Sequence, residues 1–505
     1  MSNFAKEYSV AGRIKRFFKP VRRAGFYTKL LFIIAVLIAA PSVIAFFYPE
    51  ETRYIHAFLV TAVAVAAIAL LTAIFGGKRA DDAPREWMAP VMRGAGPVMF
   101  AWGAAILAGA APFVLGGQLT PIHALFESVS GWSTTGLSVS NVDTMPHIFL
   151  FHRAFMQYCG GLGFIIFIGI LIQGRQLTNL YNAEGHPDSM MPNVRRAARV
   201  MFAIYACSLV FGTVVYSLLG MSVFDAVCHT MSALSTAGFT THSGSIGSFG
   251  SLPIELFTVL LMLIGCSNFA VLLLLVKGKF KRVWRTTEVR VMLVTIAVFV
   301  PLIALSLSLG RGQNILAALR EAVFGVVSLF STTGFRSAGF TDWVPFAFGL
   351  GTLLVLLGGS TGSTAGGIKF LRVYVLFRVT KANIKRKLSP SREVTVLRFQ
   401  RPQGAAKIDN ALVMDTVEYV VAYMAILIIG TLLLTLTERC GLFDAFYEFM
   451  SAFTTVGLSN GLTAGASPAS LILLMFGMVL GRLEIFIVFV GLYSAARTIK
   501  RRLAR

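Results

Sequence analysis

The stretch Ser328-Leu-Phe-Ser-Thr-Thr-Gly-Phe335 is one of four versions of a single eight-residue pattern in this chain. The other copies are Ser130-Gly-Trp-Ser-Thr-Thr-Gly-Leu137, Ser232-Ala-Leu-Ser-Thr-Ala-Gly-Phe239 and Ser451-Ala-Phe-Thr-Thr-Val-Gly-Leu458. An alanine also stands twelve residues before each glycine, at Ala124, Ala226, Ala322 and Ala445. Each copy of an internal repeat is one structural unit that packs against its siblings, so the pattern predicts four such units.

The composition indicates a protein that crosses a membrane many times. Of the 505 residues, 56% are hydrophobic and 13% are charged, which is too apolar for a soluble globular domain. A helix needs about twenty apolar residues to cross a bilayer. Ten segments have this character: 27–48, 54–75, 97–116, 147–172, 199–219, 252–276, 291–309, 344–368, 411–436 and 470–495. We therefore expect an all-α polytopic membrane protein with ten transmembrane helices.

The net charge of +22 would suit a nucleic-acid partner, but the distribution of the charges indicates membrane topology instead. Lys and Arg gather in every second segment between spans, at 1–26, 76–93, 175–199, 277–290, 369–407 and 497–505. Cytoplasmic loops carry such an excess, so we expect both termini in the cytoplasm. Anionic lipid of the bilayer, and no nucleic acid, is the expected partner of these charges.

Catalytic and metal chemistry are not indicated. The five cysteines are odd in number and never spaced as Cys-x-x-Cys, and the seven histidines are scattered. Neither a disulfide framework, a transition-metal site nor a catalytic cluster follows from them, so we expect no enzyme and no bound cofactor. The alternative to an ion pore is a secondary transporter of sodium or a small organic solute. That class is typically built from inverted repeats, whereas the four copies here share one orientation.

Each copy of the pattern lies between two spans, on the side with few basic residues. The apolar segment before the turn, such as 122–132, holds about eleven residues and reaches about 16 Å as a helix, so it crosses only half of a bilayer. Unpaired backbone groups at that depth are tolerated where they line a wet cavity. Four such turns are therefore expected to line one pore.

The turns predict a cation path that is coordinated mainly by the backbone. Threonine and glycine occur in all four copies, whereas the residue between them varies, so its carbonyl oxygen is the expected ligand. Glycine permits backbone angles that other residues avoid, and the negative ends of the short helices favour a cation on the same axis. The expected ion-binding residues are Thr134, Thr135, Gly136, Thr236, Ala237, Gly238, Thr332, Thr333, Gly334, Thr455, Val456 and Gly457.

With these four turns the chain resembles the Trk/Ktr/HKT superfamily of potassium transporters over residues 97–505. Further matches are Gly160-Gly-Leu-Gly163, the glycine-rich segment from Gly358 to Lys369, and Gly481-Arg482. The spans before residue 76 and the segment Gly265-Cys-Ser-Asn-Phe-Ala270 are more similar to the TrkH branch. The resemblance implies four membrane-pore-membrane repeats around one central pore plus two extra N-terminal helices. Glycine in all four turns favours potassium over sodium.

The same resemblance implies the organisation, location and partners of the chain. A basic N-terminus and two-helix extra domain would occupy 1–96, and the four pore repeats would occupy 97–196, 197–288, 289–408 and 409–505. We expect potassium uptake across a bacterial inner membrane, as a homodimer on a cytosolic ring of nucleotide-binding, TrkA-like regulatory subunits.

The glycine-rich segment is expected to interrupt a helix, because each glycine costs a helix about 1 kcal/mol relative to alanine. The resemblance implies that it forms a loop under the four turns that blocks or opens the path, with Arg482 opposing cation passage. A kink for helix packing, and a structural ion pair of Arg482, are the alternatives. The expected gate residues are Gly358, Gly359, Gly362, Ser363, Thr364, Gly366, Gly367 and Arg482.

One turn departs from the others on its outer side. Arg336 follows Gly334 by two residues, where potassium channels place a second glycine. It puts a positive charge near the pore mouth unless Asp143 or Asp342 neutralises it.

Overall fold

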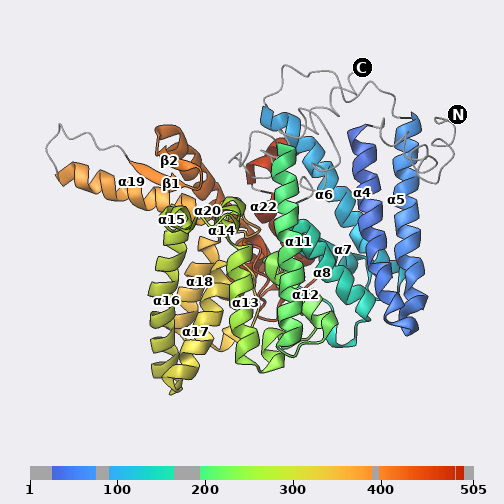
Figure 1. Ribbon diagram of the computed structural model, residues 1–505, viewed down its shortest axis with the longest axis horizontal. Coiled ribbons are helices and arrows are strands. Elements are labelled where there is room, and N and C mark those ends of the chain that lie inside the picture. Colours follow the sequence, from blue (N-terminus) through green and yellow to red (C-terminus); the bar gives the residue numbers. More distant parts are fainter. Residues whose placement is uncertain (1–24, 76–89, 164–193, 389–396, 484, 494–505) are drawn as a thin grey trace.

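The computed structural model describes residues 25–75, 90–163, 194–388, 397–483 and 485–493. Two long helices come first, followed by four units that each hold a long helix, a short helix and a further helix. The first two helices are α4 (Phe26–Ala39), which continues as the 3-10 segment Ala40–Phe46, and α5 (Ile55–Phe75). The first helices of the four units are α6 (Pro90–Leu115), α11 (Val194–Leu218), α16 (Thr287–Arg311) and α20 (Asn410–Glu438). Figure 1 shows the long helices standing side by side as one bundle.

The short helices of the four units precede the four repeated turns. They are α7 (Pro121–Trp132), α12 (Val223–Leu234), α17 (Ile315–Phe330) and α21 (Leu442–Phe453). Three of them hold 12 residues and the third holds 16, or about 18 Å and 24 Å at 1.5 Å per residue, so none matches a full bilayer. The alanine twelve residues before each glycine is fully buried in every copy, so the repeat extends over the whole short helix.

The last helix of each unit differs from copy to copy. These helices are α8 (His147–Leu162), α13 (Leu252–Gly265) with α14 (Phe269–Val276), α18 (Pro345–Leu357), and α22 (Pro468–Arg482). The pair α13 and α14 is bent by 111° at residues 266–268, a break that the sequence did not lead us to expect. The span expected at 344–368 ends at Leu357, where the glycine-rich segment begins, as expected. The part of the span expected at 147–172 beyond residue 163 lies outside the described residues.

Six of the described helices are long and apolar enough to cross a bilayer: Phe26–Phe46, Pro49–Ile74, Ala95–Leu115, Ala198–Leu218, Thr287–Arg311 and Asn410–Glu438. Two bent pairs raise the number to as many as eight. Large apolar side chains such as Phe46 and Leu218 stand more than three-quarters exposed on the flanks of the bundle, as expected for contact with lipid. The all-α membrane fold is thus confirmed.

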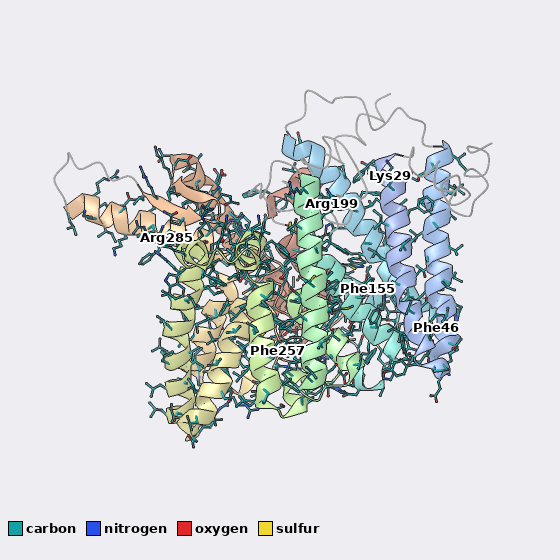
Figure 2. The ribbon with its side chains drawn as sticks, viewed as in Figure 1. Lys29, Phe46, Phe155, Arg199, Phe257 and Arg285 are labelled. Carbon is teal, nitrogen blue, oxygen red and sulfur yellow. The ribbon has the colours of Figure 1, made fainter. Side chains whose placement is uncertain are left out.

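One end of the bundle carries basic side chains and the peripheral elements. Lys29, Arg199 and Arg285 lie near this end, whereas Phe46 and Phe257 lie farther along the helices (Figure 2). The short helix α15 (Phe280–Arg285) and the helix α19 (Phe370–Leu388) also lie there, and α19 runs across the end of the bundle (Figure 1). An antiparallel hairpin of β1 (Arg398–Arg401) and β2 (Gly404–Lys407) accompanies α19, a small addition to the expected all-α fold. The basic segments 1–24, 76–89, 175–193 and 497–505 fall outside the described residues.

Candidate functional site

Each short helix ends in the same hydrogen-bonded turn. In the first copy, the Thr135 amide donates to the Ser130 carbonyl and the Thr134 amide donates to the Gly131 carbonyl. These two hydrogen bonds are the pair that defines a Schellman motif at a helix end. The same two bonds occur in the other three copies. This helix end needs a left-handed residue, for which glycine is the usual choice. Here the position is threonine in all four copies, with φ of 55°, 50°, 57° and 56° for Thr134, Thr236, Thr332 and Thr455.

A left-handed backbone costs a residue with a side chain roughly 1–2 kcal/mol, and threonine is branched at Cβ. Four such residues at equivalent places indicate that the hydroxyl is needed there. Two of the hydroxyls bond to the glycine-rich segment, as described below. The hydroxyls of Thr134 and Thr455 are buried without a hydrogen-bond partner among the described residues. An unpartnered buried oxygen is available to a ligand.

The glycines of the four turns close a ring. A side-chain carbon on Gly136 would overlap the carbonyl oxygen of Ala237, and one on Gly238 would overlap that of Thr333. A carbon on Gly334 would overlap the carbonyl of Val456, and one on Gly457 would overlap that of Thr135, which returns to the first copy. Each glycine therefore lies against the carbonyl of the variable residue in the next repeat, and the twelve residues expected to bind the ion are brought together around one axis. All four glycines have positive φ, between 72° and 94°.

The glycine-rich segment forms a loop between α18 and α19. Its two ends pass so closely that a side-chain carbon on Gly358 or on Gly367 would overlap the backbone of the other end. The amides of Ile368 and Lys369 donate to the carbonyls of Leu356 and Leu357 at 3.1 and 2.9 Å and tie the base of the loop together. Gly358, Gly362 and Gly367 have φ of 68°, 71° and 74°, which explains why glycine recurs here.

The loop lies directly against the inner side of the turns. The hydroxyl of Thr364 lies 3.0 Å from that of Thr236, and the amide of Gly366 donates to the hydroxyl of Thr332 at 2.9 Å. A side-chain carbon on Gly366 would overlap the Thr455 hydroxyl. Three of the four left-handed threonines therefore contact the loop.

Arg482 connects the loop to the first repeat. Its guanidinium donates to the carbonyl of Thr364 at 2.5 Å and to those of Gly160 and Gly161 at 2.6 and 3.0 Å. These carbonyls belong to the third and first repeats, while Arg482 ends α22 of the fourth. The positive charge is thus held beside the loop by carbonyl oxygens, which accept more strongly from a charged donor.

A second set of contacts holds the tip of the loop. The Glu288 carboxylate accepts from the Thr361 amide at 2.6 Å, and the Asn268 side-chain amide donates to the Thr361 carbonyl at 2.6 Å. Asn268 lies in the break between α13 and α14, and Glu288 lies in the first turn of α16. The unexpected break in the second repeat therefore forms a cradle for the loop of the third.

Buried carboxylates support the outer sides of the first and fourth turns. Glu127 accepts from the Ser138 hydroxyl and from the Val139 amide at 2.6 and 2.8 Å. Glu448, at the equivalent position nine residues before Gly457, accepts from the Ser459 hydroxyl at 2.6 Å. Arg153 on α8 pairs with Glu127 at 3.0 Å, and the two side chains are only 2% and 0% exposed.

Removing Arg153 should destabilise the protein strongly. Arg153→Met leaves the Glu127 carboxylate buried without its counter-charge, a change that typically costs about 3–5 kcal/mol. Thermal unfolding of the purified protein in detergent measures the loss. Arg290→Met is the control, because Arg290 is exposed and its Nε donates to the Trp284 carbonyl at 3.0 Å, so its removal leaves no buried carboxylate behind and should cost about 0.5 kcal/mol or less. Equal losses of melting temperature in the two variants would contradict the assigned role of Arg153.

Arg336 is not neutralised by direct pairing. Among the described residues, no carboxylate lies within 4.0 Å of its guanidinium, and its Nη2 donates to the Ser243 carbonyl at 3.3 Å. Asp143 accepts from the Ser243 amide at 3.0 Å, so Asp143 and Arg336 each bind a backbone group of Ser243 and do not contact each other directly. Hydrogen bonds from Ser243 lower the pKa of Asp143, which keeps its carboxylate ionised at neutral pH. Asp342 contributes its carbonyl to Arg311 instead.

Several buried polar residues at this site were missed in the sequence. Glu127 and Glu448 repeat at the same spacing before two of the glycines, which is a signal that a comparison of the copies could have found. Arg153 is a charge inside an apolar span, which by default marks a functional site or a buried partner. Asn268 stood out only as part of the TrkH-like segment from Gly265 to Ala270, and Glu288 carried no signal, because only the fold brings these two residues to Thr361.

Comparison with known proteins agrees with this geometry. Residues 61–495 match the TrkH family, which is described as cation transport protein. The chain belongs to the TrkH family. This membership makes it a multi-pass membrane transporter rather than an enzyme.

Two curated TrkH relatives and one solved structure cover most of the chain. The Trk system potassium uptake protein TrkH of Salmonella typhimurium is 30% identical over 400 residues, 76% of this chain and 81% of that protein. The protein of the same name from Halomonas elongata is 30% identical over 415 residues, 77% of this chain and 82% of that protein. The crystal structure of the potassium transporter TrkH from Vibrio parahaemolyticus matches with a TM-score of 0.81 and 27% identity, covering 94% of this chain and 98% of that one.

Proposed function

We propose that this chain carries potassium into the cell through the ring of four turns. The observation that supports this most is the closure of the ring, in which each turn glycine lies against the carbonyl of the next repeat. Rings of backbone carbonyls can replace the hydration shell of a cation, and left-handed threonines add hydroxyl oxygens at the inner side. The named relatives are potassium uptake proteins, which makes potassium the proposed substrate.

The loop from Gly358 to Gly367 is the proposed gate. It contacts Thr236, Thr332 and Thr455 beneath the ring, so its displacement is needed before an ion leaves the turns inward. The guanidinium of Arg482 lies beside this loop and opposes cation passage while it stays there. Both contacts support the interpretation of this loop as a gate over the alternative of a simple kink for helix packing.

The orientation and partners complete the proposal. The end of the bundle that carries Lys29, Arg199, Arg285 and α19 is assigned to the cytoplasm by its positive charge, in a bacterial inner membrane. A homodimer on a ring of nucleotide-binding, TrkA-like subunits is the proposed assembly. The basic last turn of α19, with Lys385, Arg386 and Lys387, lies at the end where such a ring would dock.

Growth under potassium limitation tests the proposed transport. Expression in a bacterium that lacks its own uptake systems should restore growth at low potassium. A Gly457→Val variant should not restore it, because its side chain overlaps the Thr135 carbonyl and obstructs the ring. No rescue by the unmodified chain, with the protein confirmed in the membrane, would count against potassium uptake.

A further inference from the structure

The side chain of Gln157 reaches from α8 of the first repeat to the turn of the second. Its Nε2 donates to the carbonyl oxygen of Ala237 at 2.9 Å. Its Oε1 accepts from the Ser232 hydroxyl at 2.9 Å and from the Phe239 amide at 3.2 Å. The Ala237 carbonyl can only accept and the Phe239 amide can only donate, so these two partners determine which way the side-chain amide points. Gln157 is fully buried.

Gln157 belongs to one face of α8 that follows the second turn. Arg153, one helical turn before it, places its guanidinium 4.0 Å from the centre of the Phe239 ring. Gly161, one turn after it, leaves no room for a side-chain carbon beside Ser235. Residues four apart lie on the same face of a helix. This face of α8 therefore contacts the second turn along its length, from Phe239 at the outer end to Ser235 at the inner end. Gln157 stands at the level of the ring.

The other three repeats have no such side chain. Gly160, Gly265 and Gly481 lie at equivalent places, because each packs against the carbonyl that ends its own short helix. Gly358 follows Gly334 by 24 residues, the same spacing as in the first and fourth copies. The residue three places before each of these glycines is glutamine in the first repeat but apolar in the rest: Met262, Val355 and Met478.

In three copies the serine that begins the repeated pattern is hydrogen-bonded, and its partner shows how Gln157 acts; in the fourth copy the Ser451 hydroxyl is buried without a partner among the described residues. In the first copy, the Ser130 hydroxyl accepts directly from the amide of Gly136 at 3.1 Å. In the third, the Ser328 hydroxyl donates directly to the carbonyl of Phe335 at 2.7 Å. In the second, the hydroxyl of Ser232 donates to Gln157, which then holds the turn. The second turn is therefore supported through a side chain of its neighbour.

We propose that Gln157 is a positioning residue that orients the Ala237 carbonyl and thereby contributes to cation discrimination. The inference rests on the proposed function, in which the carbonyls of the four turns coordinate the ion. A carbonyl oxygen has two lone pairs, so the one bonded to Gln157 holds the group in place while the other remains for the ion. Without this bond the Ala237 carbonyl has a wider range of orientations, and the ring fits one cation less selectively.

Ion selectivity of the full-length protein in liposomes tests this role. The ratio of potassium to sodium permeability would be measured for Gln157→Met, which copies Met262 and Met478, and for Gln157→Leu. The leucine also removes the donor to Ala237 without adding a charge, and it provides a second variant if the methionine does not fold. Both variants should lower the ratio by about threefold or more, the size expected for one hydrogen bond. Met478→Leu is the control at the equivalent place in the fourth repeat.

The outcomes separate this inference from the proposed function. Ratios within about twofold of the unmodified protein for both Gln157 variants, with a lowered ratio for Gly334→Ser, would overturn the role of Gln157 and leave the ring intact. Unchanged ratios in all of these variants, Gly334→Ser included, would overturn both. If Met478→Leu lowered the ratio of potassium to sodium permeability as much as Gln157→Met, the cause would be general repacking of the helices, and the inference would also be overturned. A lowered ratio in the Gln157 and Gly334 variants alone supports the inference.

Discussion

Gly334→Ser should lower the ratio of potassium to sodium permeability by about tenfold. The serine Cβ would overlap the carbonyl oxygen of Val456, and the residue would have to keep a φ of 72°. A left-handed backbone costs a non-glycine residue roughly 1–2 kcal/mol, and each 1.4 kcal/mol is a factor of ten in an equilibrium constant. The Val456 carbonyl must move to relieve the overlap, so one quarter of the ring loses its geometry.

Reversal potentials across planar bilayers under potassium and sodium gradients give this ratio. Gly349→Ser is the matched control, because Gly349 lies in the same repeat and has nothing within 4 Å of an added side-chain carbon. The control should keep the selectivity of the unmodified protein. An unchanged ratio in Gly334→Ser, with protein of normal size in gel filtration, would mean that the third turn is not part of the ion path.

Arg482→Ala should raise basal potassium flux by about tenfold or more. For an assumed separation of about 8 Å and an effective dielectric constant of about 20, a single positive charge opposes a passing cation by about 2 kcal/mol. The substitution also removes the donors to Thr364, Gly160 and Gly161, so the loop loses its connection to the first repeat. Both the loss of the charge and the loss of these hydrogen bonds should make it easier for potassium to pass the loop.

Potassium-dependent flux into liposomes, without any added regulatory subunit, measures this change. Arg482→Lys distinguishes the two causes, because lysine keeps the charge but lacks the planar fork that reaches several carbonyls at once. Low flux in Arg482→Lys would assign the effect to charge, and high flux would assign it to the hydrogen bonds. If Arg482→Ala showed flux equal to or below that of the unmodified protein, the gate role of Arg482 would be refuted.

The repeated elements of the fold were accessible from the sequence because their cause is local. Each short helix ends in a Schellman turn that eight residues specify, and each glycine lies where a positive φ is needed. The loop at Gly358 could be foreseen for the same reason, since neighbouring glycines disfavour a helix wherever they stand. The all-α, membrane-spanning character of the chain followed from composition, whereas six to eight spans stand among the described residues where ten were expected.

Features that break the fourfold pattern were less accessible. The bend between α13 and α14 lies at residues 266–268, inside the apolar run 252–276 that was expected to form one span. It forms where the carbonyls of Gly265 and Cys266 accept hydrogen bonds from the Thr364 hydroxyl and the Ser360 amide, in the loop of another repeat. Glu288 and Asn268 likewise gain their role from a partner more than seventy residues away.

The sequence by itself determined that this chain has four equivalent turns, each of which follows a short apolar helix and contains a glycine with a positive φ. The reason is that helix ends, glycine angles and apolar lengths depend on neighbouring residues. Only the tertiary structure decided how the turns meet. It places each glycine against the next repeat, brings Arg482 to a loop more than a hundred residues earlier, and connects Gln157 to a single carbonyl of the ring. These contacts depend on packing between repeats, which spacing within one repeat does not encode.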